Sequence, residues 1–167
     1  MTLELVDLVD EHNRVVGQAD RRTVRSQNLL HRGVGILVQN ARGAVYVHQR
    51  TATKDVFPNL FDMFVGGVVE SGESYLEAAR REVAEELGVV GPEPEWLFEH
   101  LYEGPLNRSF IHVYRVRWEG PIRHQESEIC WGDWLEHDRL EEWARQVSVV
   151  PDGLAVFHHY LEWLRQA

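Results

Sequence analysis

The chain has 167 residues, 44% of them hydrophobic, so it can bury one sizeable core but leaves little room for two independent domains. Its formal net charge of −10 excludes nucleic-acid binding by bulk electrostatics, and the lack of any apolar run of about 18 residues excludes a membrane-spanning helix. The single cysteine, Cys130, excludes an internal disulfide framework; we expect it to pack as a small core residue in a protein of the reducing cytoplasm.

The N-terminal part of the chain is expected to form short strands. Alternation of apolar and polar residues predicts two hairpins, built from residues 3–9 with 14–20 and from residues 33–39 with 44–50. Gly43 lies in the second turn, at a position that suits positive φ. Residues 24–32 are polar and irregular, so we expect no regular element there.

A loop over residues 51–59 and a strand over residues 60–69 then lead to the best-defined helix of the chain. Ser74 and Glu77 have the spacing of a capping box, and Gly88 suits a C-terminal stop, so we expect a helix between them. One face of this helix carries the apolar stripe expected to contact the core: Leu76, Ala79, Val83 and Leu87.

The C-terminal part alternates strands with helices. The apolar patterns predict strands at 96–103, 109–118 and 128–135 and amphipathic helices at 137–147 and 151–166. Strands interleaved with helices indicate a mixed-sheet α/β or α+β sandwich. Because no linker is evident, we expect one domain over residues 1–167.

The helix after Ser74 concentrates negative charge beside its apolar stripe. Glu82, Glu85 and Glu86 project into one third of its circumference, at the edge of the core. Such like charges repel by a few tenths of a kcal/mol, which a divalent cation would relieve, since Mg²⁺ takes oxygen ligands. A solvated helix face is the alternative. Gly66 and Gly67 on the preceding turn leave backbone groups free to approach a ligand, which favours the metal site.

The spacing around these glutamates resembles a known family motif. From Gly67, five residues lead to Glu73 and seven more lead to Arg81-Glu82-Val83-Ala84-Glu85-Glu86-Leu87-Gly88-Val89. This order resembles the Nudix box, G-x5-E-x7-R-E-U-x-E-E-x-G-U with U a bulky aliphatic residue, at every defined position of residues 67–89. The resemblance implies an α/β/α sandwich with a mixed sheet and an N-terminal β-hairpin, and hydrolysis of a nucleoside diphosphate linked to another moiety.

The resemblance also implies a metal site. Glu82, Glu85 and Glu86 are implied as ligands of Mg²⁺ or Mn²⁺, with the carbonyl of Gly66 as a further ligand. The cation would neutralise the diphosphate, polarise phosphorus and lower the pKa of the attacking water. The expected partner is a small-molecule diphosphate substrate, and the frequency of dimers in the family allows a homodimer.

Roles for other members of the box follow in the same way. A carboxylate must take the proton from the attacking water. Because the base varies within the family, Glu82 and Glu86 are the first candidates and Glu128, from another segment, is a rival. Arg81 and Glu73 are implied as structural braces, since their pairing would hold the loop against the helix.

Outside the box, the chain resembles the isopentenyl-diphosphate isomerase branch of the family. The similarity covers residues 8–21, His31 at the start of the next strand, and Glu126–Cys130. The isomerase needs a reactive cysteine and a metal-binding histidine at the positions of Gly66 and Val68. We therefore expect a hydrolase on an isomerase-like scaffold; an isomerase variant and a non-catalytic diphosphate-binding module are the alternatives.

Three basic residues are candidate phosphate contacts: Arg50, Lys54 and Arg32. Their charged groups suit phosphate oxygens, although a solvated surface charge is the alternative for each. His31 is either structural or a ligand, and isolated histidines are more often structural.

Two further pairs have both a functional and a structural interpretation. Phe57 and Phe61 could stack on a base or line an apolar pocket, whereas packing in the core is the simpler alternative. Glu126 and Glu128 would alternate along a possible strand, so both could face the cleft. Surface exposure is the alternative for both glutamates.

Overall fold

The computed structural model describes residues 4–167. Its strands are β1 (Leu5–Val9), β2 (Val15–Asp20), β3 (His31–Gln39), β4 (Val45–Arg50), β5 (Phe61–Asp62), β6 (Val65–Val68), β7 (Glu95–Glu103), β8 (Arg108–Arg117) and β9 (Ile129–Leu135). Its helices are α1 (Arg21–Ser26), α2 (Tyr75–Leu87), the 3₁₀ helix η1 (His137–Arg139), α3 (Leu140–Gln146) and α4 (Pro151–Gln166). None of the helices in this part of the chain is long and apolar enough to span a membrane.

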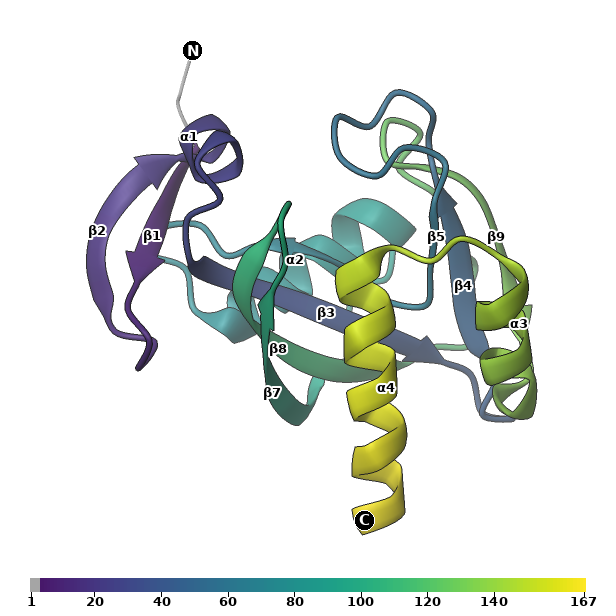
Figure 1. Cartoon of the computed structure of the whole chain (residues 1–167). Helices are drawn as coiled ribbons and strands as arrows, with labels where there is room; N and C mark the ends of the chain where they lie inside the picture. Colours follow the sequence, from purple (N-terminus) through teal and green to yellow (C-terminus); the bar gives the residue numbers. More distant parts are fainter. Residues whose placement is uncertain (1–3) are drawn as a thin grey trace.

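β3 is the central strand of a mixed sheet (Figure 1). It runs parallel to β8 along its whole length, and β6 pairs antiparallel with its first half. β7 extends the sheet beyond β8, whereas β5 and β9 pair with β4. β1 and β2 form a separate hairpin, as predicted. The architecture confirms the expected sandwich with a mixed sheet and an N-terminal hairpin.

The predicted second hairpin is present only near its turn. β3 and β4 pair at a single position, Gln39 with Val45, and Gly43 between them has a φ of 83°. The two strands then diverge because their backbone groups bond elsewhere. β3 uses them for β6 and β8, and β4 uses them for β5 and β9.

Helices cover both faces of the sheet. In β3 the alternating side chains Val34, Ile36 and Val38 pack in the core that includes α2, whereas Leu37 packs in the core that includes α3 and α4. Figure 1 shows α4 crossing one face of the sheet while α2 lies behind the other. Each face is therefore buried by a different helical layer, which is the arrangement a two-sided sheet requires.

Helix α2 begins and ends as predicted. Ser74 Oγ accepts the N–H of Glu77 at 3.0 Å, and Glu77 Oε1 accepts the N–H of Ser74 at 3.0 Å. Gly88 ends the helix in the left-handed conformation, with a φ of 70°. The expected apolar stripe lies in the core, with Leu76 at its edge: Ala79, Val83 and Leu87.

Helix α1 occupies part of the segment that the sequence was expected to leave irregular. Asp20 caps it, since its carboxylate accepts the N–H of Thr23 at 3.0 Å and the hydroxyl of Thr23 at 2.9 Å. Val24 is the buried residue that anchors it. A helix of six residues is too short to show apolar periodicity, so this cap is its only clear signal in the sequence.

The predicted strand over residues 60–69 is divided in two. β5 pairs with β4 and β6 pairs with β3. Between them Asp62 Oδ1 accepts the N–H of Phe64 at 3.1 Å, which turns the chain from one partner strand to the other.

Cys130 is exposed, contrary to its predicted place in the core. Ile129, its neighbour on β9, is the buried residue of the pair. Side chains alternate across a strand, so Cys130 points the other way, and its Sγ lies 3.6 Å from the carbonyl oxygen of Arg50 on the partner strand.

The approach of β6 to β3 creates a position that only glycine fits. A Cβ at Gly66 would overlap the carbonyl oxygen of Val34, whereas a Cβ at Gly35, which faces Gly66 across the two strands, would lie 3.7 Å from Phe64 Cβ. We expect Gly66→Ala to lower the free energy of unfolding by about 2–4 kcal/mol, because a strand must move, and the matched Gly35→Ala to change it by less than about 1 kcal/mol. Equal effects in denaturant titrations would contradict this expectation.

Candidate functional site

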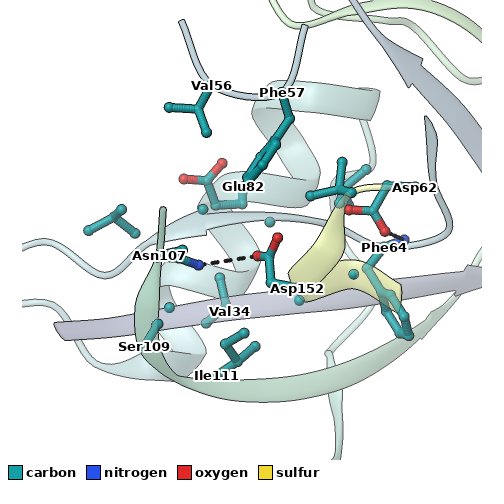
Figure 2. A pocket seen from close by; sticks show the side chains of 18 of the residues that line it. Val34, Val56, Phe57, Asp62, Phe64, Glu82, Asn107, Ser109, Ile111 and Asp152 are labelled. Carbon is teal, nitrogen blue, oxygen red and sulfur yellow. Dashed lines mark hydrogen bonds between the residues drawn. The ribbon is translucent and has the colours of Figure 1, made fainter. Parts of the chain in front are cut away.

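A cleft of about 350 Å³ opens beside the glycine-rich strand β6. Its walls come from α1, β6, α2, the loop after β4 and the first turn of α4. Figure 2 shows Glu82, Asp62 and Asp152 among its lining side chains, with Val34 and Ile111 on the sheet. Its size is in the range of small-molecule sites.

Glu82 and Glu86 lie one turn apart on α2 and face the backbone of β6. Their residue surfaces are 8% and 6% exposed, respectively. Glu86 Oε2 accepts the N–H of Gly66 at 3.0 Å. A Cβ at Gly67 would lie 2.7 Å from Glu82 Cδ, so only a glycine lets this carboxylate lie directly against the strand.

Burial makes both carboxyl groups easier to protonate. It raises the pKa of Glu86 well above its ordinary value, and the charges of Glu82 and Glu128 raise this pKa further. Burial also raises the pKa of Glu82 to about 7, against the opposing influence of Arg81. A positive charge placed between these groups would restore their ionised forms.

Arg81 connects the helix to the loop before it. Its Nε and Nη2 donate to Glu73 Oε2 and Oε1 at 2.7 and 2.9 Å, so the expected pairing is present and bidentate. Nη2 also donates to the carbonyl of Val68 at 3.1 Å, and Nη1 donates to Glu82 Oε1 at 2.8 Å. Glu85, about half exposed, lies 3.5 Å from the same Nη1.

Glu128 reaches the cleft because the segment before β9 packs on the end of α2. The N–H of Gln125 donates to the carbonyl of Glu86 at 3.0 Å, and the N–H of Glu128 donates to that of Gln125 at 2.9 Å. Glu126 and Glu128 were expected on a strand, but both lie in this turn. Glu128 is half-buried and lines the cleft, whereas Glu126 is exposed and does not line it.

Two of the predicted phosphate contacts line the cleft. Lys54 forms an ion pair with Glu128. Arg50 donates to the carbonyls of Val56 and Phe57 at 2.8 and 3.2 Å, so part of its hydrogen-bonding capacity already holds the loop after β4.

Arg32 does not line the cleft, contrary to expectation. It donates from Nε and Nη2 to the side-chain and backbone oxygens of Asn13, each at 2.8 Å. Its neighbours on β3, His31 and Gly33, do line the cleft, and alternation turns Arg32 toward the hairpin. Helix α1 instead supplies Arg21 and Arg25, which the sequence analysis missed because it missed the helix.

Histidine and phenylalanine side chains divide between the cleft and its surroundings. His31 is buried in the wall, where its Nδ1 donates to a backbone carbonyl at 2.8 Å and burial lowers its pKa. Phe57 lines the cleft with a φ of 53°. Phe61 is half-buried and packs edge-on against Trp131 and Trp143 instead, so it does not line the cleft.

Two aspartates that the sequence analysis did not single out line another part of the cleft. Burial raises the pKa of Asp62 to about 8, with a further contribution from the charge of Asp152. Asp152 Oδ2 accepts the side-chain N–H of Asn107 at 3.3 Å (Figure 2), and burial raises its pKa as well. These residues are far apart in the sequence and belong to no motif, so only the folded chain brings them together.

The residues present fit a hard divalent cation. Glu82, Glu85, Glu86 and the Gly66 carbonyl form an all-oxygen donor set, which Mg²⁺ and Mn²⁺ prefer. Within residues 4–167, however, no three acidic, histidine or cysteine side chains lie grouped so that they could hold a metal ion. Arg81 engages Glu82 and Glu85 instead, and it would have to share them with a cation.

Comparison with known proteins agrees with this geometry. Residues 29–152 match the NUDIX domain. SCO1686 of Streptomyces coelicolor, an uncharacterized Nudix hydrolase, is 46% identical over 162 residues, which cover 96% of this chain and 90% of that protein. YfcD of Escherichia coli, also an uncharacterized Nudix hydrolase, is 37% identical over 151 residues, which cover 90% of this chain and 83% of that protein.

Solved structures show the same architecture. DR0079 of Deinococcus radiodurans superimposes with a TM-score of 0.74 at 33% identity, covering 87% of this chain and 92% of that one. The Nudix domain of Shewanella oneidensis NrtR, solved with ADP ribose, has a TM-score of 0.61 at 20% identity, covers 81% of this chain and 87% of that one, and shows the fold alone. The chain therefore belongs to the Nudix hydrolase family, whose enzymes hydrolyse phosphorus anhydrides.

Proposed function

We propose that the chain is a divalent-metal-dependent hydrolase that cleaves a diphosphate linkage in a small nucleoside-diphosphate-type metabolite by attack of water on phosphorus. The observation that carries this proposal is the burial of Glu82 and Glu86 against the backbone of Gly66 and Gly67 in a cleft. Two buried acids side by side destabilise each other's charged form, and a cation shared with a diphosphate would remove that cost.

The residues of α2 and β6 would position the cation. Glu82, Glu85, Glu86 and the Gly66 carbonyl would hold Mg²⁺ or Mn²⁺. When bound, the cation would neutralise the diphosphate and lower the pKa of the attacking water. The hydrogen bond from the Gly66 N–H to one oxygen of Glu86 fixes the direction of the other oxygen.

Three carboxylates are candidates for the general base. Glu82 and Glu86 come first because they are the most buried of the box glutamates, and Glu128 is the rival because its charge acts on Glu86 from a separate segment. Replacing each of these glutamates in turn would identify the base. Loss of the base should lower turnover without changing metal affinity, whereas loss of a metal ligand should lower both.

Basic side chains in the same cleft would offset the charge of a diphosphate. Arg21 and Arg25 come from α1, and Arg50 and Lys54 come from β4 and the loop after it. All four can reorganise around phosphate oxygens, which guanidinium and ammonium groups bind well.

The alternatives have less support. An isomerase would need a cysteine at position 66, where any Cβ would overlap the carbonyl oxygen of Val34. A non-catalytic diphosphate-binding module would need no complete set of box glutamates, whereas Glu82, Glu85 and Glu86 are all retained.

A phosphate-release assay tests the proposal directly. The purified chain would be incubated with Mg²⁺ or Mn²⁺ and a panel containing ADP-ribose, NADH, coenzyme A, dinucleoside polyphosphates, nucleotide sugars and isoprenoid diphosphates, followed by phosphatase. We expect metal-dependent hydrolysis of at least one nucleoside-diphosphate compound. Isomerisation of isopentenyl diphosphate without hydrolysis of any compound would refute the proposal.

Replacing Glu86 should separate activity from stability. We expect Glu86→Gln to lower the hydrolysis rate by about a hundredfold or more, because it removes a charged oxygen from the site. The same change should leave the melting temperature unchanged or higher, because it removes a group that burial makes costly to ionise while the amide oxygen can still accept the Gly66 N–H. The control is Glu93→Gln at an exposed position. Full metal-dependent turnover by Glu86→Gln would refute the site assignment.

We also propose that Glu73 and Arg81 brace the loop against α2, which predicts a pH-dependent contribution to stability. Although burial acts in the opposite direction, the hydrogen bond from Arg81 lowers the pKa of Glu73 below its ordinary value. The stabilising effect of the Glu73–Arg81 pair is therefore present above about pH 4.5, the ordinary pKa of a glutamate, and is lost as the pH falls through the lower pKa of Glu73 in the folded chain.

We expect Glu73→Gln to lower the free energy of unfolding by about 1–2 kcal/mol at pH 7 and by much less at pH 3. Denaturant titrations of both proteins at the two pH values measure the difference. A gap that stays constant between pH 7 and pH 3 would show that the charge of Glu73 does not brace the loop.

A further inference from the structure

In the part of the chain that the structure describes, the buried side-chain polar atoms that lack a partner all belong to residues of the cleft. Within residues 4–167, four buried side-chain nitrogen or oxygen atoms have no hydrogen-bond partner, namely Asn28 Oδ1, His48 Nδ1, Ser109 Oγ and Asp152 Oδ1. All four residues line this one cleft. Buried polar atoms are nearly always paired, so their concentration at one place indicates a missing ligand or water.

Three of these residues gather around the loop between β7 and β8. Asn28 Nδ2 donates to the carbonyl of Gly104 at 2.8 Å, and Asp152 Oδ2 accepts from Asn107 at 3.3 Å. Ser109, only 1% exposed, follows Asn107 by two residues on β8. We call Asn28, Ser109 and Asp152 the acceptor cluster.

We propose that the acceptor cluster binds N–H or O–H donors on the non-phosphate part of the substrate, and so selects nucleoside- or sugar-linked diphosphates over hydrocarbon-linked ones. This inference rests on the proposed function for the place of the diphosphate in the same cleft. The existing hydrogen bonds determine which atoms face the cleft unpaired. Asn28 donates its amide N–H to Gly104, which leaves its oxygen without a partner, and Asp152 accepts from Asn107 with one oxygen, which leaves its second oxygen without a partner. Asn28 Oδ1, and the second oxygen of Asp152 in its ionised form, can only be satisfied by a donor.

Nearby charges favour a neutral ligand. Asp62, beside Asp152, holds its proton at neutral pH because burial raises its pKa to about 8. The positive charge of Arg50 acts on both aspartates. The site therefore carries little uncompensated negative charge for a cation to neutralise.

A hydrocarbon chain would suit the sheet but not the cluster. Val34, Phe64 and Ile111 give the cleft apolar surface. An isoprenoid tail would contact them, yet it would also displace any water from the acceptor cluster and leave its oxygens unpaired, which costs binding free energy. A base or sugar would contact the apolar side chains and also donate hydrogen bonds to the acceptor cluster.

Binding of non-hydrolysable ligands tests the proposal. Isothermal titration calorimetry would compare, in Mg²⁺, the α,β-methylene analogues of ADP, of ribose 5-diphosphate and of isopentenyl diphosphate. We expect at least one of the first two to bind tenfold or more tightly than the third. If the ribose analogue suffices, sugar hydroxyls supply the donors; if only the ADP analogue binds, the base supplies them.

Two variants probe the cluster itself. Ser109→Ala removes a hydroxyl, and Asp152→Asn keeps the shape but turns an amide N–H toward the cavity if its oxygen stays on Asn107. Each should weaken the donor-bearing ligand about tenfold and leave the isopentenyl analogue unchanged, whereas the exposed control Ser148→Ala should change neither. Ser109→Ala should keep or raise the melting temperature, because it deletes an unpaired buried hydroxyl.

Equal affinity for all three analogues, or unchanged affinity in both variants, would overturn the inference. The outcome is separable from that of the proposed function because methylene analogues are not hydrolysed. If the chain binds the ADP analogue through the cluster but hydrolyses no compound, only the proposed hydrolase activity is refuted. If the chain hydrolyses a nucleoside-diphosphate compound but binds all three analogues equally, only the role of the cluster is refuted.

Discussion

The close contact between the β6 backbone and α2 is the constraint on which the rest of the site depends. β6 lies so near β3 that a side chain at position 66 would meet the Val34 carbonyl, and so near α2 that a side chain at position 67 would meet Glu82. Two glycines are therefore required by two different neighbours. Given that contact, the carboxylates of Glu82 and Glu86 can be buried against a strand and still receive an N–H from it. The capping box and Gly88 then fix the length of α2.

This arrangement fixes the geometry of the site, but it buries acidic groups whose ionised forms are then destabilised. Glu82 and Glu86 are buried together. Burial and the charge of Glu82 raise the pKa of Glu86, and burial and the charge of Glu85 raise the pKa of Glu82. Arg81 offsets part of the cost by contacting Glu82, Glu85 and Glu73 at once. The apolar cores on both faces of the sheet supply the stability that offsets the rest of this unfavourable free energy. Such local destabilisation is common where a site is built for a ligand that supplies the missing charge.

Local signals in the sequence were sufficient for α2 and insufficient for most of the cleft. The cap, the apolar stripe, the stop and the charge pattern of α2 lie within about two dozen neighbouring residues, so their meaning could be read before folding. Cys130 shows the limit, because a correct strand assignment does not say which face a side chain takes. Arg32 shows a second limit, because it was placed before the strand whose alternation turns it away from the cleft. Helix α1 was missed because its only signal was one cap, and Asp152 because its partners are distant in sequence.

The two parts of the cleft are built from different pieces of chain, and this separates chemistry from recognition. The carboxylates and the glycine backbone belong to β6 and α2, within one continuous motif. The acceptor cluster comes from the turn after α1, the start of β8 and the first turn of α4, none of which is part of that motif. Substitutions in these outer elements can change hydrogen-bond polarity without moving the box. In the proposed function, the box carries out the hydrolysis, whereas the identity of the group beyond the diphosphate depends on side chains such as Asn28, Ser109 and Asp152 that only tertiary structure brings together.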